Sequence, residues 1–341
     1  MKAKKTLALS LVFLMILIGF CSCTKDEEPI SSQQFVMDTV LTQKLYSSKD
    51  ASDEVYEALS ELENRLSAFK EGSEIYKINN ADGKSTTLSK DTFELVEKSA
   101  AFAKESGYLF DISVYPLSRL WKSAIENGKL PEKNEVLSAK SLVGTQKITL
   151  DKENLSITLQ KGMGLDLGAV AKGAALEKVR KIYEQKGVSG AICSLGNSAM
   201  LLFGNKAGED FKIGLKNPLE NADGKLFATL LLSDCIVSTS GGYERFVEIE
   251  GKKYHHIIDT KTGYPAENDI ASVTVVGSDG AFCDYMSTRL FLEGFENSVK
   301  LIEQNEIAAV VVTNDKKVYV SKSLEEKIEI TDSSFERINI K

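Results

Sequence analysis

The chain has 341 residues, of which 43% are hydrophobic and 27% charged, and its formal net charge is −7. This composition is typical of a globular protein that is long enough for one large or two ordinary domains. The excess of acidic over basic residues argues against nucleic acid as a partner, because the chain has too little positive charge to neutralise many phosphates. The two histidines, His255 and His256, are too few for a multi-histidine metal centre.

The first 22 residues have the features of an export signal. Lysines near the start precede an apolar run at 7–20, which is shorter than a usual membrane span. A cysteine at the end of such a run resembles a bacterial lipoprotein signal, in which the cysteine carries the lipid. Cys23 is the favoured position, and Cys21 is the second candidate because the residue before it suits cleavage less well. An ordinary cleaved signal peptide is the alternative. We therefore expect an exported protein, lipid-anchored on the outer face of the cytoplasmic membrane or on its periplasmic side, with a tether at 23–33 and one domain at 34–341.

The first half of the domain is predicted to mix helices with short strands. A stripe of apolar residues at three- and four-residue spacing predicts a helix at 53–69, capped by Ser52 or Asp53. The stretch 67–79 is expected to be a loop, and 109–117 is an apolar, β-prone run. The other predicted elements are a strand at 35–46, helices at 91–105 and through Trp121, a loop-rich segment, and a hairpin of 146–150 with 155–160.

A glycine-rich stretch at 161–173 leads into a predicted helix that ends at Gly187. Its four glycines permit tight turns and close approaches, and the N-terminus of the following helix favours an anion. The spacing matches neither a P-loop nor the dinucleotide-binding pattern. By itself the stretch indicates a turn suited to phosphate, and a simple tight turn between strand and helix is the alternative.

The second half is predicted to be rich in strands. A turn is expected at 238–245, and Cys193, Cys235 and Cys283 are interpreted as small buried residues. The interleaving of helices with hairpins favours an α+β fold with a mixed, largely antiparallel sheet packed with helices. The predicted strands are 190–195, 199–203, 211–216, 226–232, 243–250, 253–258, 271–276 and a hairpin of 307–313 with 318–321, and the helices are 282–292 and 296–304.

Asp284 and Thr288 are the clearest candidates for chemistry. They lie four residues apart in a predicted helix and so share one face, where their oxygens suit Mg²⁺. Helix capping by the aspartate is the structural alternative. The segment 254–265 carries both histidines, which in such positions are usually satisfied core or surface residues.

Several motifs recur in a characteristic order along the chain. They are Met37-Asp38-Thr39, Ser73-Glu74 with Asn79, Phe110-Asp111 with Pro116-Leu117, Asp166 to Gly173, Thr239 to Arg245, His256 to Asp259 with Thr262-Gly263, and Asp284 with Thr288. In this order they resemble the motifs of the ApbE family of flavin transferases, many of which are lipoproteins. The resemblance implies an ApbE-like (T-fold-like) architecture. The chain departs from the family pattern at Ala169, at Asn197-Ser198, at Thr260 and at Cys283.

The resemblance implies a reaction. FAD would be split at its pyrophosphate, AMP would leave, and FMN would be joined by a phosphoester bond to a Thr or Ser of an acceptor protein. Acceptors in the family are flavin-carrying subunits of membrane redox pumps or extracellular electron-transfer proteins with a flavinylation motif. Two alternatives remain open, namely a Mg²⁺-dependent FAD pyrophosphatase and a flavin-binding lipoprotein without catalysis.

The resemblance also implies site residues. His256 and Asp284 would be catalytic, with His256 either deprotonating the acceptor hydroxyl or orienting flavin or phosphate. Mg²⁺ would be held by the Ala169 carbonyl, Asp284, Thr288 and Ser287. The FAD pocket would be lined by Met37, Phe69, Leu109, Phe110, Asp111, Asp166, Lys172 and Ile258.

Overall fold

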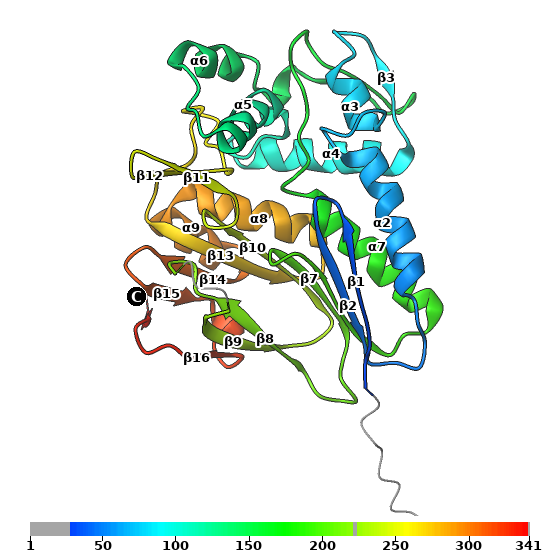
Figure 1. The fold of residues 1–341 in the computed structure, drawn as a ribbon, viewed down its shortest axis with the longest axis vertical. Coiled ribbons are helices and arrows are strands. Elements are labelled where there is room, and N and C mark those ends of the chain that lie inside the picture. Colours follow the sequence, from blue (N-terminus) through cyan, green and yellow to red (C-terminus); the bar gives the residue numbers. More distant parts are fainter. Residues whose placement is uncertain (1–27, 221–223, 340–341) are drawn as a thin grey trace, which may run out of the picture.

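The computed structural model describes residues 28–220 and 224–339 (Figure 1). The predicted signal peptide, with Cys21 and Cys23, lies outside these residues. Across the two described ranges, no helix combines the length and apolar character needed to cross a membrane.

A nine-stranded sheet forms the centre of the fold, in the order β1-β2-β6-β7-β10-β13-β14-β15-β17. Neighbouring strands are antiparallel except β15 and β17, which are parallel. The strands are β1 (Ile30–Val36), β2 (Thr39–Leu45), β6 (Gly190–Leu195), β7 (Ala199–Gly204), β10 (Cys235–Gly241), β13 (Ile270–Gly277), β14 (Ala308–Thr313), β15 (Lys317–Val320) and β17 (Glu336–Ile338).

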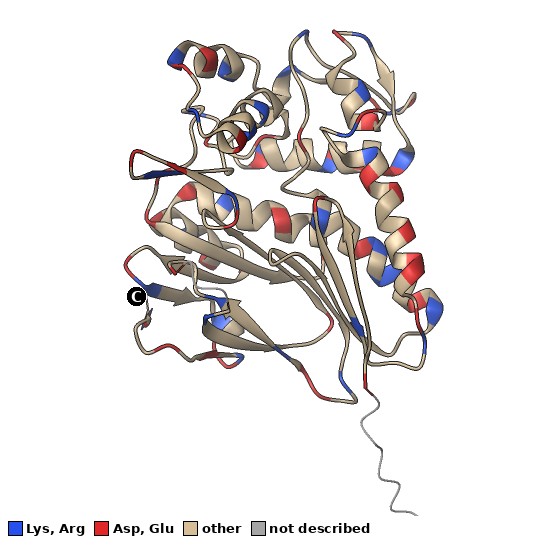
Figure 2. Ribbon diagram, in the orientation of Figure 1, with Lys and Arg blue, Asp and Glu red and all other residues tan. Residues whose placement is uncertain are grey.

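Helices cover one face of this sheet, and further helices stack beyond them (Figure 1). Helices α7 and α8 lie against the sheet, α2 packs on α7, and α9 packs on α8. The helices are α2 (Ser52–Leu66), α3 (Glu74–Asn79), α4 (Lys90–Glu105), α5 (Tyr115–Asn127), α6 (Lys133–Ser141), α7 (Ala171–Lys186), α8 (Gly280–Glu293) and α9 (Phe295–Gln304). Figure 2 shows many charged residues along α2, α4 and α7, whereas α8 carries few of them.

Smaller sheets complete the fold. A sheet in the order β16-β9-β8 packs an apolar face against the central sheet, where Phe211 and Phe227 meet Leu202 and Val310. The strands of the smaller sheets are β3 (Thr86–Thr87), β4 (Thr149–Asp151), β5 (Ser156–Thr158), β8 (Phe211–Lys216), β9 (Leu226–Leu232), β11 (Phe246–Ile249), β12 (Lys252–His255) and β16 (Ile328–Ile330). The predicted α+β class with a largely antiparallel sheet is confirmed. Cys193 and Cys283 are buried free thiols as predicted, and Cys235 is partly buried.

The predicted single strand at 35–46 is wrong, because the segment is a hairpin. Met37 and Asp38 have φ of 55° and 56°, which gives the tight two-residue turn that suits the twist of paired strands. Strand β1 begins at Ile30 and pairs with β2 along its whole length, so the predicted tether ends earlier than residue 33. Neither Ser52 nor Asp53 caps α2, since Ala51 precedes the helix.

The predicted loop at 67–79 is also wrong in its second half, where the structure has helix α3. Ser73 caps α3 by accepting a hydrogen bond from the N–H of Tyr76 at 2.9 Å. The β-prone run at 109–117 forms a single 3₁₀ turn and then enters α5, with Pro116 in the first turn. Helix α6 lies in the segment expected to be rich in loops, and its N-terminus is closed by a capping box of Glu132 and Glu135.

The predicted turn at 238–245 contains a central strand, because β10 runs from Cys235 to Gly241 between β7 and β13. Hydroxyl side chains made this segment look like a turn. In the fold some of them have distant partners: Thr239 Oγ1 lies 2.9 Å from Thr274 Oγ1, and Ser240 Oγ lies 2.8 Å from Ser287 Oγ.

Candidate functional site

A cavity of about 1090 Å³ is bounded by the β1–β2 turn, the loop after α2, α5, the start of α7, the end of β10 and α8. Its size is at the upper end of ordinary ligand pockets. It brings together nearly all residues predicted from the sequence, although they are spread over most of the chain. Those lining it are Met37, Phe69, Leu109, Phe110, Asp111, Asp166, Ala169, Lys172, His256, Ile258, Asp284 and Thr288. Ser287 does not border it.

One wall of the cavity is fixed by a close crossing of α7 and α8. A Cβ atom at Gly173 would lie 1.9 Å from the carbonyl oxygen of Gly280, so the two backbones meet where no side chain fits. This crossing carries Asp284 to the first turn of α7, where its Oδ2 accepts a hydrogen bond from the Gly173 N–H at 2.7 Å. A carboxylate at this position interacts favourably with the helix dipole.

Asp284 is an ionisable group held in the protein interior, with 6% of its surface exposed. Burial raises the pKa of its carboxyl above the ordinary value, and the positive charge of Lys172 opposes this shift. Lys172 also donates a hydrogen bond to Ser198 Oγ. A carboxylate kept here in its charged form therefore needs positive charge nearby.

Hydroxyl groups gather around the same wall. Ser240 Oγ lies 2.8 Å from Ser287 Oγ and 3.1 Å from Thr288 Oγ1, and Ser287 donates to the Asp284 carbonyl at 3.0 Å. Ser287 is buried behind the wall, so its hydroxyl supports the wall rather than facing a ligand. In the part of the chain that the structure describes, no group of three or more His, Cys, Asp or Glu side chains could hold a metal ion. The donor set is one carboxylate with hydroxyl and carbonyl oxygens.

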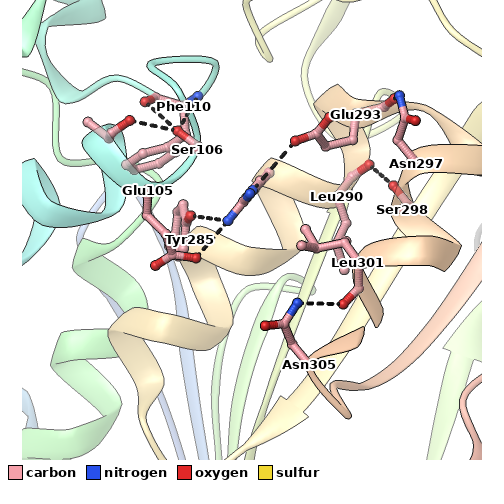
Figure 3. A network of polar contacts seen from close by, with 12 residues as sticks. Glu105, Ser106, Phe110, Tyr285, Leu290, Glu293, Asn297, Ser298, Leu301 and Asn305 are labelled. Carbon is pink, nitrogen blue, oxygen red and sulfur yellow. Dashed lines mark hydrogen bonds and ion pairs between the residues drawn. The ribbon is translucent and has the colours of Figure 1, made fainter. Parts of the chain in front are cut away.

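A neighbouring face of α8 packs against α4. Tyr285 stacks on Phe102 with ring centroids 4.2 Å apart and also meets Phe110 edge-on at 4.9 Å. Arg289 Nη1 donates to Glu105 at 2.7 Å and to the Tyr285 hydroxyl at 2.9 Å, and Figure 3 shows Glu105, Tyr285 and Phe110 around this network. These contacts fix the rotation of α8 and hence the direction in which Asp284 points.

The glycine-rich stretch is held by side-chain hydrogen bonds to its backbone. Asn79 accepts from the Leu165 N–H at 2.6 Å and donates to the Leu165 carbonyl at 2.9 Å. Asp166 accepts from Ser118 Oγ at 2.7 Å and from the Gly168 N–H at 2.9 Å. Both carboxylate oxygens of Asp166 thus have protein partners, and the stretch has a defined shape before any ligand binds.

Asp111 has a similar bracing role. Its carboxylate accepts hydrogen bonds from the Ser113 N–H and Oγ at 2.8 and 2.6 Å, from the Thr145 N–H at 2.9 Å, and from Thr145 Oγ1. The side chain therefore joins two distant loops at the cavity wall. The sequence identified Asp111 as a pocket residue but could not show its partner, which lies 34 positions away.

The aromatic part of the cavity is more open. The Phe69 side chain is 37% exposed, and its ring lies 5.5 Å from that of Tyr115. The Lys122 ammonium sits over the Phe69 ring at 4.1 Å from its centroid. Sequence reasoning missed Lys122, because a single lysine on an amphipathic helix has no distinguishing signal.

His256 borders the cavity and is exposed to it. Loss of hydration lowers its pKa to about 4, with a further contribution from the neighbouring His255, so the imidazole is neutral at pH 7. Its Nδ1 lies 3.3 Å from the carbonyl oxygen of Arg245. Because a carbonyl only accepts, this contact favours a proton on Nδ1 and leaves the Nε2 lone pair free.

Glu244 is a second residue for which sequence reasoning indicated no role. It borders the cavity, and its Oε1 is buried without a hydrogen-bond partner. Burial raises the pKa of its carboxyl, against the positive charges of Lys172 and Arg245. Its place in the motif at 239–245 was the available signal.

Comparisons with known proteins identify the family of this chain. The model of the ApbE family matches residues 37–311. A curated relative from Klebsiella pneumoniae (strain 342), named FAD:protein FMN transferase, is 32% identical over 92% of this chain and 98% of its own length. A relative of the same name from Treponema pallidum (strain Nichols) is 27% identical over 95% of this chain and 96% of its own length.

Solved structures give the same result for the fold. The crystal structure of the ApbE protein from Thermotoga maritima has a TM-score of 0.81 at 25% identity and covers 88% of this chain and 99% of that one. The flavin transferase ApbE from Vibrio cholerae, at 22% identity, has a TM-score of 0.77 over the same shares and supports the fold alone. Because the family model matches residues 37–311 and a relative is 32% identical over almost its whole length, this chain belongs to the ApbE family.

Proposed function

We propose that this protein is a Mg²⁺-dependent flavin transferase, which moves FMN from FAD to a Thr or Ser hydroxyl of an acceptor protein and releases AMP. Curated relatives that match almost the whole chain carry the name FAD:protein FMN transferase. The observation that carries the proposal is the buried Asp284 carboxylate on the wall of a cavity of about 1090 Å³. A divalent cation there would stabilise the charged carboxylate that burial disfavours.

The residues on this wall suit a magnesium ion. Mg²⁺ prefers oxygen ligands, usually takes one or two carboxylates, and leaves positions for substrate phosphates. Asp284, Thr288 and the Ala169 carbonyl border the cavity and would hold the ion, while the Ser287 hydroxyl donates to the backbone carbonyl of Asp284 behind the wall. When bound, the ion supplies charge neutralisation at the pyrophosphate of FAD.

The proposed step is a phosphoryl transfer in which the acceptor oxygen bonds to the phosphorus of the FMN half. The P–O bond to AMP breaks, and AMP leaves with the electron pair on its phosphate oxygen. The hydroxyl proton goes to Nε2 of His256, which the Arg245 carbonyl leaves unprotonated. The protein's own contribution is positioning and charge, because little covalent chemistry is required of it.

Binding of FAD would use both parts of the cavity. Phe69 offers an exposed ring for stacking on the isoalloxazine, and Lys172 adds positive charge near Asp284. Apolar side chains and braced loops supply the remaining wall, from Met37, Leu109, Phe110, Asp111, Asp166 and Ile258.

The proposed setting is outside the cytoplasmic membrane, with the chain anchored through a lipid on Cys23 or Cys21. The N-terminal lysines, apolar run and cysteines support this setting. The acceptor would be a flavin-carrying subunit of a redox pump or an extracellular electron-transfer protein. Growth with labelled palmitate, followed by isolation of wild type, Cys23→Ala and Cys21→Ala proteins, tests the anchor and identifies the modified cysteine.

The transfer itself is tested with mature protein, FAD, Mg²⁺ and an acceptor domain that carries a flavinylation motif. We expect a fluorescent acceptor band on a denaturing gel, with one AMP released for each FMN attached. FMN and AMP released at the same rate without acceptor would indicate a pyrophosphatase instead. Binding of FAD without release of AMP would indicate a flavin-binding protein, and either result would contradict the proposal.

A further inference from the structure

The β1–β2 hairpin carries an exposed apolar pair beside the cavity. Phe35 and Val40 face each other in the strand register and are 67% and 47% exposed. Directly opposed residues of an antiparallel pair lie on the same face, so the two side chains form one patch. The next pair on that face, Gln33 and Thr42, is polar, which confines the patch to the end of the hairpin nearest the turn.

This patch is continuous with the rim of the cavity. Val40 belongs to both, and its neighbours Met37, Asp38 and Thr39 line the cavity as well. Figure 1 shows the hairpin in blue along one side of the central sheet, with its turn at the level of α8. A ligand too large to enter the cavity can therefore reach the cavity mouth while it covers Phe35.

The patch is held in a fixed position relative to the cavity. The Val40 carbonyl accepts a hydrogen bond from the Gly196 N–H at 2.8 Å, and the Asp38 carbonyl accepts from Arg245 Nη2 at 3.2 Å. Arg245 also provides the carbonyl that contacts His256. A partner seated on the hairpin thus has a defined place relative to the imidazole.

We propose that Phe35 and Val40 form the docking surface for the acceptor protein, which lays an apolar side chain on them while its hydroxyl enters the cavity. This inference rests on the proposed function and deepens it. The second substrate of that reaction is a macromolecule, and its reacting group must enter while its bulk stays at the rim. Phe35 is 67% exposed, so the described part of the chain leaves its ring open to a partner.

The decisive variant is Phe35→Ser, since Phe35 does not line the cavity. With the flavinylation-motif acceptor domain, we expect the KM for acceptor to rise about tenfold, a loss of roughly 1.4 kcal/mol in binding. The kcat and the affinity for FAD, followed by flavin fluorescence, should stay within about twofold of wild type. Phe35→Leu, which keeps the apolar surface, should restore most of the loss.

Leu231→Ser is the matched control, because Leu231 is 46% exposed on β9 and does not line the cavity. It should leave the KM for acceptor unchanged. Binding of an acceptor whose accepting residue is replaced by alanine gives a second readout that requires no chemistry, and Phe35→Ser should weaken it equally.

Three results would overturn the docking surface. The first is an unchanged KM for acceptor in Phe35→Ser, and the second is an equal rise of that KM in Leu231→Ser. The third is that Phe35→Ser weakens only the binding of the protein to vesicles made of anionic and zwitterionic lipids, which would make the patch a membrane contact. Absence of transfer by the wild type would instead contradict the proposed function and the docking surface with it. Transfer by the wild type with an unaffected Phe35→Ser contradicts the docking surface alone.

Discussion

The two sides of the cavity are built in contrasting ways. The α7–α8 wall is buried and its backbones touch at Gly173 and Gly280. Its carboxylate accepts a hydrogen bond from the Gly173 N–H, and its hydroxyls contact one another. The opposite side, with Phe69 and the β1–β2 hairpin, exposes aromatic and aliphatic surface. The contrast indicates that the group needing exact placement is held by the core, while the groups that recognise large ligands lie on surfaces open to them.

The largest expected effect comes from Asp284→Asn on the buried wall. Loss of the carboxylate removes the only charged oxygen of the proposed cation site, so we expect transfer to fall at least about 10³-fold. A gel assay of acceptor fluorescence across a Mg²⁺ titration measures this. Residual activity within tenfold of wild type would contradict the assignment.

The same substitution should stabilise the metal-free protein at neutral pH. The folded-state pKa of Asp284 is raised by burial, so the ionised group costs stability above its unfolded value of 3.8, and this cost grows as pH rises through the folded pKa. Thermal unfolding in EDTA at pH 5 and pH 8 should show a gain for Asp284→Asn that is larger at pH 8.

Asp279 on the same helix provides a control of opposite sign. Burial alone would raise its pKa, but hydrogen bonds from Lys98 and from the Phe282 N–H lower it below the ordinary value. Its stabilisation is therefore present at neutral pH and is lost as pH falls through its folded pKa. Asp279→Asn should thus lower the melting temperature at pH 8, where Asp284→Asn raises it.

His256→Asn should reduce transfer by about 10²- to 10³-fold, the usual contribution of a general base. Because the pKa of His256 is lowered to about 4, the neutral imidazole persists well below the ordinary value of 6.5. The ratio of wild-type to variant rates should therefore stay flat from pH 8 to pH 5. A ratio that falls with a midpoint near pH 6.5 would show that the imidazole is hydrated and has an ordinary pKa.

Gly173→Ala tests whether the buried wall depends on the helix crossing. The added methyl group would meet the Gly280 carbonyl, so we expect a loss of about 1–3 kcal/mol in the free energy of unfolding and weaker Mg²⁺ binding. Ala174→Gly, one position along α7, should cost about 1 kcal/mol through helix propensity and leave Mg²⁺ binding intact. Chemical denaturation and calorimetry separate the two effects.

Phe69→Ala, on the open side, should have the smallest effect. Loss of one stacking ring should weaken FAD binding by about 5- to 10-fold, from roughly 1–1.5 kcal/mol of aromatic contact. Phe69→Tyr keeps the ring and should bind FAD as wild type does. A titration of flavin fluorescence measures both, and equal affinity in all three proteins would place the flavin elsewhere.

Local patterns in the sequence predicted much of the fold. Alternating or continuous apolar runs predicted β6, β8 and β9 with their observed bounds, and the spacing of Asp284 and Thr288 placed them on one face of α8. Both signals depend only on residues close in sequence.

Several errors occurred where distant partners decide the structure, although the hairpin at Met37-Asp38 and the caps of α3 and α6 are local features. The hydroxyl-rich sequence of β10 is typical of a turn, and only the fold shows that its hydroxyls contact Thr274 and Ser287. The partners of Asp111 and the position of Lys122 over Phe69 likewise depend on contacts across the fold. The residues named from the motif resemblance line one cavity, except Ser287, whose place behind the wall the motif did not show.

The proposed function depends on one divalent cation that is held by the α7–α8 wall and binds the pyrophosphate of FAD. The most direct test is a crystal structure of the protein with FAD and Mn²⁺, using anomalous scattering to locate the ion. We expect a peak at roughly 2.0–2.2 Å from the Asp284 carboxylate and the Ala169 carbonyl, between them and the pyrophosphate. Bound FAD with its pyrophosphate away from Asp284, and no ion at this wall, would contradict it.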